Sequence, residues 1–250
     1  MCSRMFIPVL VQVRKGGIGE ALVTEYTHRG LHAIATVLPE ESSAHLSEAG
    51  IAFFPLDVTD EKSVEGLKHS VQKLTGGYLH VLINCAGIAY TMTAIDTDLS
   101  AVKHTFDVNV FGPMRSIGGV IPYLYGSSYN ATRAALQHRS SSLRVEMSPF
   151  MLAIDSYYSP LAEDFQQHVT GTPAGATDRF KYAVNVVERS LKPSPPAWFW
   201  YGSFTTMIRL MDTFGWRTIW DSILWKMFDL EKLKMAHANR FRREAAGESI

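Results

Sequence analysis

The stretch Phe6-Ile-Pro-Val-Leu-Val-Gln-Val13, followed directly by Arg14-Lys-Gly-Gly-Ile-Gly19, determines how the rest of the chain is interpreted. The first part is apolar and β-branched, which predicts a buried strand with Pro8 tolerated near its start. The second part leads into an amphipathic pattern over Glu20–Gly30, which predicts a helix. A glycine-rich turn lets the backbone approach a pyrophosphate at a helix N-terminus, where amides and dipole favour anions. We expect this turn to bind a cofactor phosphate through Gly16, Gly17, Ile18 and Gly19.

Strands and helices are predicted to alternate along the first half of the chain. Three further strands are expected at Leu31–Leu38, Ile51–Leu56 and Leu79–Asn84. Helices are expected around Glu40–Ala49, at Glu61–Leu74 with Thr59 or Asp60 as its cap, and at Ser100–Leu124. This alternation predicts an α/β fold with a doubly wound parallel sheet and right-handed crossovers. Ligands of such sheets bind at the carboxyl ends of the strands, where the strand order reverses.

Polar residues stand at these expected strand ends. Asp57 follows the third strand, in a position to accept a hydrogen bond from an adenine amino group or to cap a helix. Asn84 and Gly87 follow the fourth strand, the glycine leaving room for a cofactor. Asn109 lies within an apolar helix and therefore needs a partner. Each residue alone has a simpler explanation as a cap, a turn or a core amide, but their order favours a cofactor site.

A tyrosine and a cation are spaced for proton transfer in Tyr129-Asn-Ala-Thr-Arg133. Residues at i and i+4 share one helix face, and a guanidinium beside a phenol favours the phenolate and lowers its pKa. Such a pair suits proton exchange with a carbinol oxygen during hydride transfer. Taken alone, such a pair is more typical of a solvated helix surface.

In this order, the motifs resemble those of the short-chain dehydrogenase/reductase family, closely over residues 6–150 and loosely beyond. Two short sequences are similar to those of a fungal 1-acyl-dihydroxyacetone-phosphate-reductase-like branch of the family. They are residues 16–22, Gly-Gly-Ile-Gly-Glu-Ala-Leu, and residues 127–132, Ser-Ser-Tyr-Asn-Ala-Thr. The resemblance implies a Rossmann-like fold and an oxidoreductase that uses NADP(H), with NAD as an open alternative. Its substrate would be a carbonyl or secondary alcohol.

The resemblance also implies individual roles. Tyr129 would be the proton donor, and Asn109 would anchor a proton-relay water. Arg133 would bind the nicotinamide ribose beside Tyr129 and lower the pKa of the phenol.

Two departures from the family pattern are substitutions. The opening loop should begin with Thr-Gly, but Val11, Gln12 and Val13 occupy that region, so weaker pyrophosphate binding is expected. Arg133 replaces the family's lysine, and a planar guanidinium does not reproduce the contacts of a compact ammonium.

Two further departures are missing segments. Tyr123–Ser128 is too short to cross the sheet and also supply a fifth strand and a catalytic serine, and neither Ser127 nor Ser128 lies at the family's serine position. After a strand stub at Met151–Ile154, the family's Pro-Gly loop is absent. We therefore expect a sheet with fewer strands, left by gene decay or a misassigned coding sequence. The second hypothesis for function is an inactive paralogue that acts as a binding or interaction protein.

The composition of the chain indicates which partners, cellular compartment and metals to expect. The 24 basic and 24 acidic residues balance, which argues against a nucleic-acid partner. Two distant cysteines, Cys2 and Cys85, indicate a reducing compartment, and the expected localisation is cytoplasmic. The nine histidines show no metal-ligand spacing, so no metal is expected. We predict one domain over 1–250, with a cofactor-binding half at 1–125, a degenerate catalytic half at 126–192 and an aromatic cap at 193–250.

The aromatic cap leaves two alternatives open. All five tryptophans lie in it, interleaved with Arg209, Arg217 and Lys226. This segment, 197–230, could contact a membrane such as the ER, or a lipid droplet, peripherally. The favoured alternative is a last strand at Ala197–Gly202 and a helical cap over a substrate pocket or a homo-oligomer interface. Its apolar character predicts an apolar or lipid-like small-molecule substrate.

Overall fold

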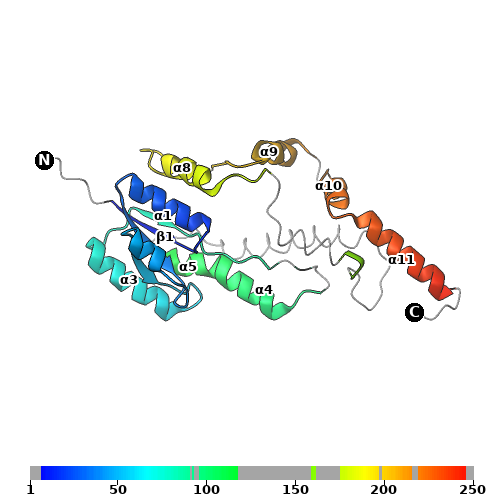
Figure 1. Ribbon diagram of the computed structural model, residues 1–250, viewed down its shortest axis with the longest axis horizontal. Helices are drawn as coiled ribbons and strands as arrows, with labels where there is room; N and C mark the ends of the chain where they lie inside the picture. Colours follow the sequence, from blue (N-terminus) through cyan, green and yellow to red (C-terminus); the bar gives the residue numbers. More distant parts are fainter. Residues whose placement is uncertain are drawn as a thin grey trace, which may run out of the picture. The chain divides into compact units, whose positions relative to one another are not determined.

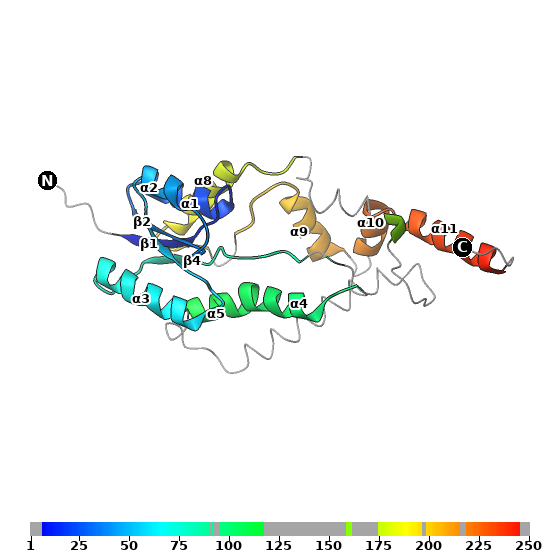
Figure 2. The same ribbon diagram turned by 60° about the horizontal axis from the view of Figure 1, so that its bottom comes forward.

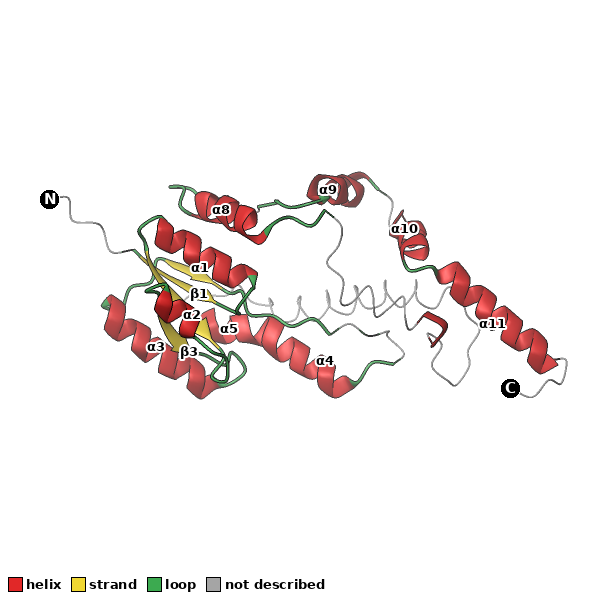
Figure 3. Cartoon of the chain, in the orientation of Figure 1, coloured by secondary structure: helices red, strands yellow, loops and turns green. Residues whose placement is uncertain are grey.

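The computed structural model describes residues 7–90, 92, 96–117, 159–161, 175–196, 199–215 and 219–245 (Figure 3). It divides into two compact units: a sheet unit of residues 1–90, 100–121 and 175–205, and a second unit of residues 91–99, 122–174 and 206–250. The predicted residues Tyr129, Arg133, Ser127 and Ser128, and the expected missing segments around them, lie outside the described residues.

The sheet unit contains four parallel strands, β1 (Pro8–Gln12), β2 (His32–Val37), β3 (Ala52–Pro55) and β4 (Val81–Ile83). Their order is β3-β2-β1-β4, and β1, labelled in Figure 1, is paired to β2 on one side and to β4 on the other. These are the four predicted strands. The doubly wound parallel α/β sheet is therefore confirmed, and the strand order reverses between β1 and β4.

Helices cover both faces of the sheet (Figure 2). One face carries α1 (Ile18–His28), α2 (Ala44–Glu48) and α8 (Arg179–Ser190). The other carries α3 (Glu61–Thr75) and α5 (Gly112–Ile117), and α4 (Leu99–Phe106) extends beyond the sheet. The single helix expected from Ser100 is interrupted by a π-helical turn, η1 (Asp107–Phe111).

β1 is the centre of two apolar cores, one on each face. Its residues are all buried, as expected of a strand covered on both faces. Val9 and Val11 point to the face with α1 and α8, whereas Leu10 points to the face with α3. Burying each such side chain completely contributes about 1.5–3 kcal/mol.

The ends of α3 follow the sequence signals. Of the two expected capping residues, Asp60 caps the helix, because its carboxylate accepts from the Lys62 backbone N–H at 3.0 Å. Gly76 ends the helix with φ +67°, a left-handed conformation that glycine adopts without a Cβ penalty.

The second unit contains the predicted helical region. Its helices are α9 (Thr205–Phe214), α10 (Ile219–Met227) and α11 (Leu230–Ala245), with a 3-10 turn, η2 (Ser159–Leu161). Leu161 packs with Leu230 and Leu233 in a small core. No helix in the described ranges has the length and apolar character needed to span a bilayer. The predicted boundaries near residues 125 and 192 stay predictions.

The expected last strand at Ala197–Gly202 is not found in its described part, Phe199–Gly202. No strand in the described residues lies beside this segment to pair with it. Its rings pack instead on α8 and on each other, with Tyr201 6.2 Å from Tyr182 and stacked on Phe199 at 6.1 Å between centroids. The described residues Phe199–Gly202 therefore form no strand, although their aromatic composition is typical of one.

α8 is tied to α1 by a buried hydrogen bond between Tyr26 and Ser190. The Tyr26 hydroxyl lies 2.6 Å from Ser190 Oγ, and the Tyr26 ring is fully buried. Because Ser190 Oγ donates its proton to the Val187 carbonyl at 2.9 Å, the tyrosine is the donor. Burial raises the pKa of Tyr26, while Ser190 and the charge of Arg29 act in the opposite direction.

We expect Tyr26→Phe to lower the free energy of unfolding by about 1 kcal/mol, the net worth of one hydrogen bond, because the ring still fills its site. Urea unfolding followed by circular dichroism measures the change. Tyr78→Phe, at a site 75% exposed, is the control and should leave stability unchanged. Equal stability of both variants would show that the Tyr26–Ser190 contact contributes nothing.

Candidate cofactor-binding site

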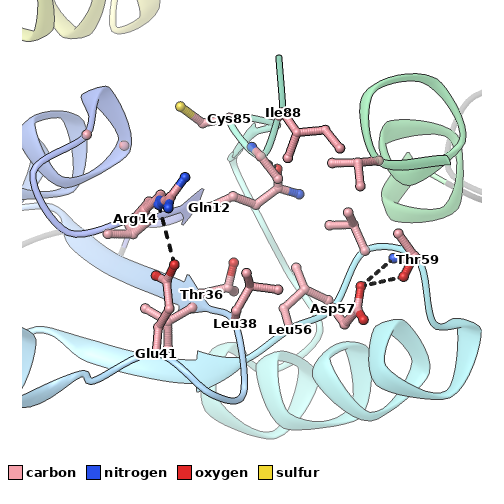
Figure 4. A pocket seen from close by; sticks show the side chains of 18 of the residues that line it. Gln12, Arg14, Thr36, Leu38, Glu41, Leu56, Asp57, Thr59, Cys85 and Ile88 are labelled. Atoms are coloured by element: carbon pink, nitrogen blue, oxygen red, sulfur yellow. Dashed lines mark hydrogen bonds and ion pairs between the residues drawn. The ribbon is translucent and has the colours of Figure 1, made fainter. Parts of the chain in front are cut away.

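A cavity of about 560 Å³ opens at the carboxyl ends of the four strands (Figure 4). This is the edge at which parallel sheets bind ligands, and it includes the point where the strand order reverses. Its lining comes from the loop after β1, the ends of β2 and β3, the segment after β4, and the helix that contains η1. The lining residues are Gln12, Val13, Arg14, Gly17, Ile18, Gly19, Thr36, Val37, Leu38, Glu41, Leu56, Asp57, Val58, Thr59, Cys85, Ala86, Gly87, Ile88, His104 and Val108.

Gln12, the last residue of β1, holds the segment after β4 in place. Its side chain is 5% exposed, and its Oε1 accepts from the Ala86 backbone N–H at 2.7 Å. Its Nε2 donates to Asn84 Oδ1 at 3.2 Å. The sequence interpretation treated Gln12 only as a departure from the family loop. The missed signal was an amide at the end of an apolar run, which must find partners when buried.

Asn109 holds the same segment from the other side. Its Nδ2 donates to the Ile88 carbonyl and its Oδ1 accepts from the Ile88 N–H, both at 2.8 Å. The expectation that this amide needs a partner is confirmed. Asn109 lies in the π-helical turn η1, and such turns recur at functional sites.

The glycine-rich turn brings the N-terminus of α1 to the cavity. Gly17, Ile18 and Gly19 line it, and Gly17 is the N-cap of α1. A Cβ at Gly19 would lie 2.1 Å from the Gln12 carbonyl oxygen, so only glycine allows this approach of helix to strand. The first turn of α1 can thus present backbone amides to a phosphate. Gly16 does not line the cavity.

Asp57 lines the far end of the cavity, as its proposed contact with adenine requires. Its Oδ1 accepts from the Thr59 N–H at 2.8 Å and the Thr59 hydroxyl at 2.7 Å (Figure 4). This local turn fixes the carboxylate without using it as the cap of α3. Arg115 supports the same loop by donating to the Val58 carbonyl at 3.1 Å, and it pairs with Asp107 of η1 at 2.6 Å.

An ion pair lies at the end of the cavity beside β2. Arg14 Nε is 3.5 Å from Glu41 Oε1, and the Arg14 side chain is 80% exposed (Figure 4). Neither Arg14 nor Glu41 was predicted from the sequence as a residue of the site. Arg14 and Glu41 lie in two different loops, so no local sequence pattern predicts that they pair.

The structure therefore brings most of the predicted cofactor residues together. Gly17, Ile18, Gly19, Asp57 and Gly87 line the cavity, whereas Gly16 does not, and Asn84 and Asn109 contact the lining residues Gln12 and Ile88. Their position, at the carboxyl ends of the strands where the strand order reverses, is the one at which sheets of this kind bind dinucleotides. Within the described ranges, no three His, Cys, Asp or Glu side chains gather as metal ligands would.

Comparison with known proteins defines the class of protein. Residues 8–128 match the family model described as short chain dehydrogenase. The Short-chain dehydrogenase fogD of Aspergillus ruber is 59% identical over 273 residues, covering 92% of this chain and 96% of fogD. The Short-chain dehydrogenase virD of Hypocrea virens is 53% identical over 273 residues, covering 92% and 95%. The chain belongs to the short-chain dehydrogenase family, whose members are oxidoreductases acting on CH–OH groups with nicotinamide cofactors.

Two more distant similarities agree with this assignment. A solved short-chain dehydrogenase from Streptomyces avermitilis has the same fold, with a TM-score of 0.60, 19% identity, and coverage of 92% of this chain and 98% of its own. The NADPH-dependent 1-acyldihydroxyacetone phosphate reductase of Schizosaccharomyces pombe is 35% identical over 162 residues, covering 57% of this chain and 55% of its own. The predicted resemblance to that reductase is thus a distant one.

Cys85 offers a test of the cavity wall. Burial raises the pKa of its thiol, against a smaller effect of a hydrogen bond from the Gly19 backbone. Less thiolate is then present at neutral pH, and the thiolate is the reactive form. In a Cys2→Ser background, we expect alkylation by iodoacetamide at pH 8 to be about tenfold slower than for a short cysteine peptide. The urea-unfolded chain is the control and should react at the peptide's rate. A folded chain that reacts as fast as the peptide would contradict the burial.

Proposed function

We propose that this chain binds NADP(H) in the described cavity and serves the reduction of a carbonyl, or oxidation of a secondary alcohol, in an apolar or lipid-like small molecule. The observation that carries the cofactor choice is Arg14, a cation on the glycine-rich loop that lines the cavity opposite Glu41. The apolar substrate is proposed from α9, where Met207, Leu210 and Phe214 expose large apolar side chains.

The charges around Arg14 favour a 2′-phosphate over a 2′-hydroxyl. Leu38 follows β2, where an acidic residue would read a ribose 2′-hydroxyl. An exposed pair such as Arg14–Glu41 has little net strength, so a phosphate carrying more charge than a carboxylate can replace Glu41. The neighbouring Lys15 adds a second positive charge on the exposed loop. The NADPH dependence of the Schizosaccharomyces pombe relative supports the same choice.

Two substitutions test this proposal. Arg14→Gln should weaken NADPH binding about tenfold and leave NADH binding unchanged, because one charge-assisted contact to the 2′-phosphate is lost. Glu41→Gln should tighten NADPH binding by about threefold, since Arg14 no longer has a competing carboxylate. Dissociation constants come from NAD(P)H fluorescence titrations. Arg29→Gln is the matched control, because it breaks the 2.7 Å pair with Glu25 and a 3.5 Å contact with the Val184 carbonyl, and none of these residues lines the cavity. Equal losses for NADPH and NADH in Arg14→Gln would exclude a role in cofactor choice.

A second candidate is a protein that binds the cofactor without turnover. The alignments with fogD and virD each span 273 positions, whereas 92% of this 250-residue chain is about 230 residues. About 43 aligned positions therefore have no counterpart here. This supports the expectation that the serine-bearing segment and the Pro-Gly loop are absent. A chain that lacks them would bind and orient the cofactor but lack part of the catalytic half.

Arg133→Lys distinguishes a weak enzyme from a silent one. If the arginine limits catalysis, the substitution should raise kcat about tenfold, because a compact ammonium suits the ribose and the Tyr129 phenol better. NADPH oxidation with a panel of apolar ketones and aldehydes measures the rate, and Arg29→Lys is the control. Tight NADPH binding with no turnover in either chain would favour the second candidate and identify the absent segments as limiting.

A further inference from the structure

The loop between β1 and α1 begins later than the family pattern requires. Val13 stands where a glycine was expected, and it is 7% exposed. Its backbone N–H donates to the Thr36 carbonyl at 2.7 Å, so the pairing with β2 continues beyond the last residue of β1. Val13 therefore belongs to the sheet, and the chain can turn only from Arg14 onward.

The turn itself is closed by a hydrogen bond from the Gly17 N–H to the Arg14 carbonyl at 2.9 Å. Gly16 occupies its third position with φ +78°. Turns with a positive φ at this position need glycine. In this conformation the Gly16 N–H points to the side chain of Glu20, and Glu20 Oε2 accepts it at 2.6 Å.

Glu20 is placed for this contact by the start of α1. Gly17 is the N-cap and has no side chain to satisfy the first amides, and Glu20 is the third residue after it. A glutamate at that position reaches back to backbone N–H groups before the helix, which is half of a capping box. Its charge is also favourable near the positive end of the helix dipole.

Side chains from two other helices lie beside the Glu20 carboxylate. Arg179 Nη1, in the first turn of α8, is 3.7 Å from Oε2. His45 Nε2, on α2, is 3.8 Å from Oε1, and this nitrogen is buried without a hydrogen-bond partner among the described residues. The Glu20 side chain is 23% exposed. The carboxylate thus joins the turn to both helices that pack beside α1.

We infer that Glu20 is a positioning residue that holds the glycine-rich turn in its cofactor-receptive form, in place of the freedom lost when valine occupies position 13. Glu20 does not line the cavity, so it acts through Gly16 and Gly17 rather than by touching the cofactor. The inference deepens the proposed function and rests on it in one respect, that this turn receives the cofactor phosphates.

Hydrogen exchange of the cofactor-free protein tests the turn directly. In Glu20→Ala, the amides of residues 14–19 should exchange about tenfold faster, because a charge-assisted hydrogen bond is lost. Glu20→Gln keeps an acceptor but loses the charge, and its exchange should lie between the wild type and Glu20→Ala. Glu25→Gln is the matched control on the same helix, since Glu25 pairs only with Arg29 at 2.7 Å and should leave the turn unchanged. NADPH titrations of the same four proteins should show about tenfold weaker binding in Glu20→Ala.

The outcomes separate the inference from the proposed function. Wild-type exchange at residues 14–19 in Glu20→Ala and Glu20→Gln would overturn the inference, as would faster exchange spread along the whole of α1. If Glu20→Ala fails to fold, Glu20→Gln decides by the same criterion. Faster exchange confined to the turn, with no NADPH binding even in the wild type, would support the role of Glu20 and reject the proposed function.

Discussion

The complete burial of β1 is the constraint on which the sheet unit depends. Because β1 is paired on both edges and covered on both faces, the position of its last residue, Gln12, is fixed. Two parts of the site are built on that residue. The Gln12 carbonyl approaches α1 so closely that only glycine fits at position 19, and the Gln12 side chain ties β1 to the segment after β4. A single buried strand end thereby fixes the position of both the glycine-rich turn and the segment after β4 on the other side of the cavity.

The segment after β4 shows how an irregular loop becomes a fixed wall. Residues 84–88 form neither helix nor strand, and unpaired backbone groups would be costly at a partly buried site. Two side-chain amides supply the hydrogen-bond partners that a neighbouring strand would otherwise provide to the backbone of this loop. Gln12 accepts from Ala86, and Asn109 pairs with both polar groups of Ile88. The π-helical turn η1 contains Asn109, which is exposed and still makes both of these hydrogen bonds to the loop.

The sequence predicted the parts of the molecule that depend on local patterns. The four predicted apolar runs form the four strands, and Asp60 caps α3. Both features follow from patterns of residues close together in the chain. The sequence did not predict interactions between residues that are distant in the chain. The Arg14–Glu41 pair joins two loops. The hydrogen bond that Gln12 accepts comes from Ala86, more than 70 residues away in the chain. Phe199–Gly202 has strand-like composition, but a strand also needs a neighbour, and composition cannot supply one.

Cofactor binding and turnover depend on different parts of this chain. The cavity is built by residues 12–108, and α8 covers α1 through the Tyr26–Ser190 hydrogen bond and the Arg179–Glu20 ion pair. Neither contact uses the region around Tyr129 and Arg133. α8 comes after the region around Tyr129 and Arg133 in the chain. A shorter version of that region is therefore compatible with this fold only if the remaining residues still let α8 reach α1. The described cofactor site therefore depends on the packing around β1, whereas the proposed catalytic pair, Tyr129 and Arg133, lies outside the described residues.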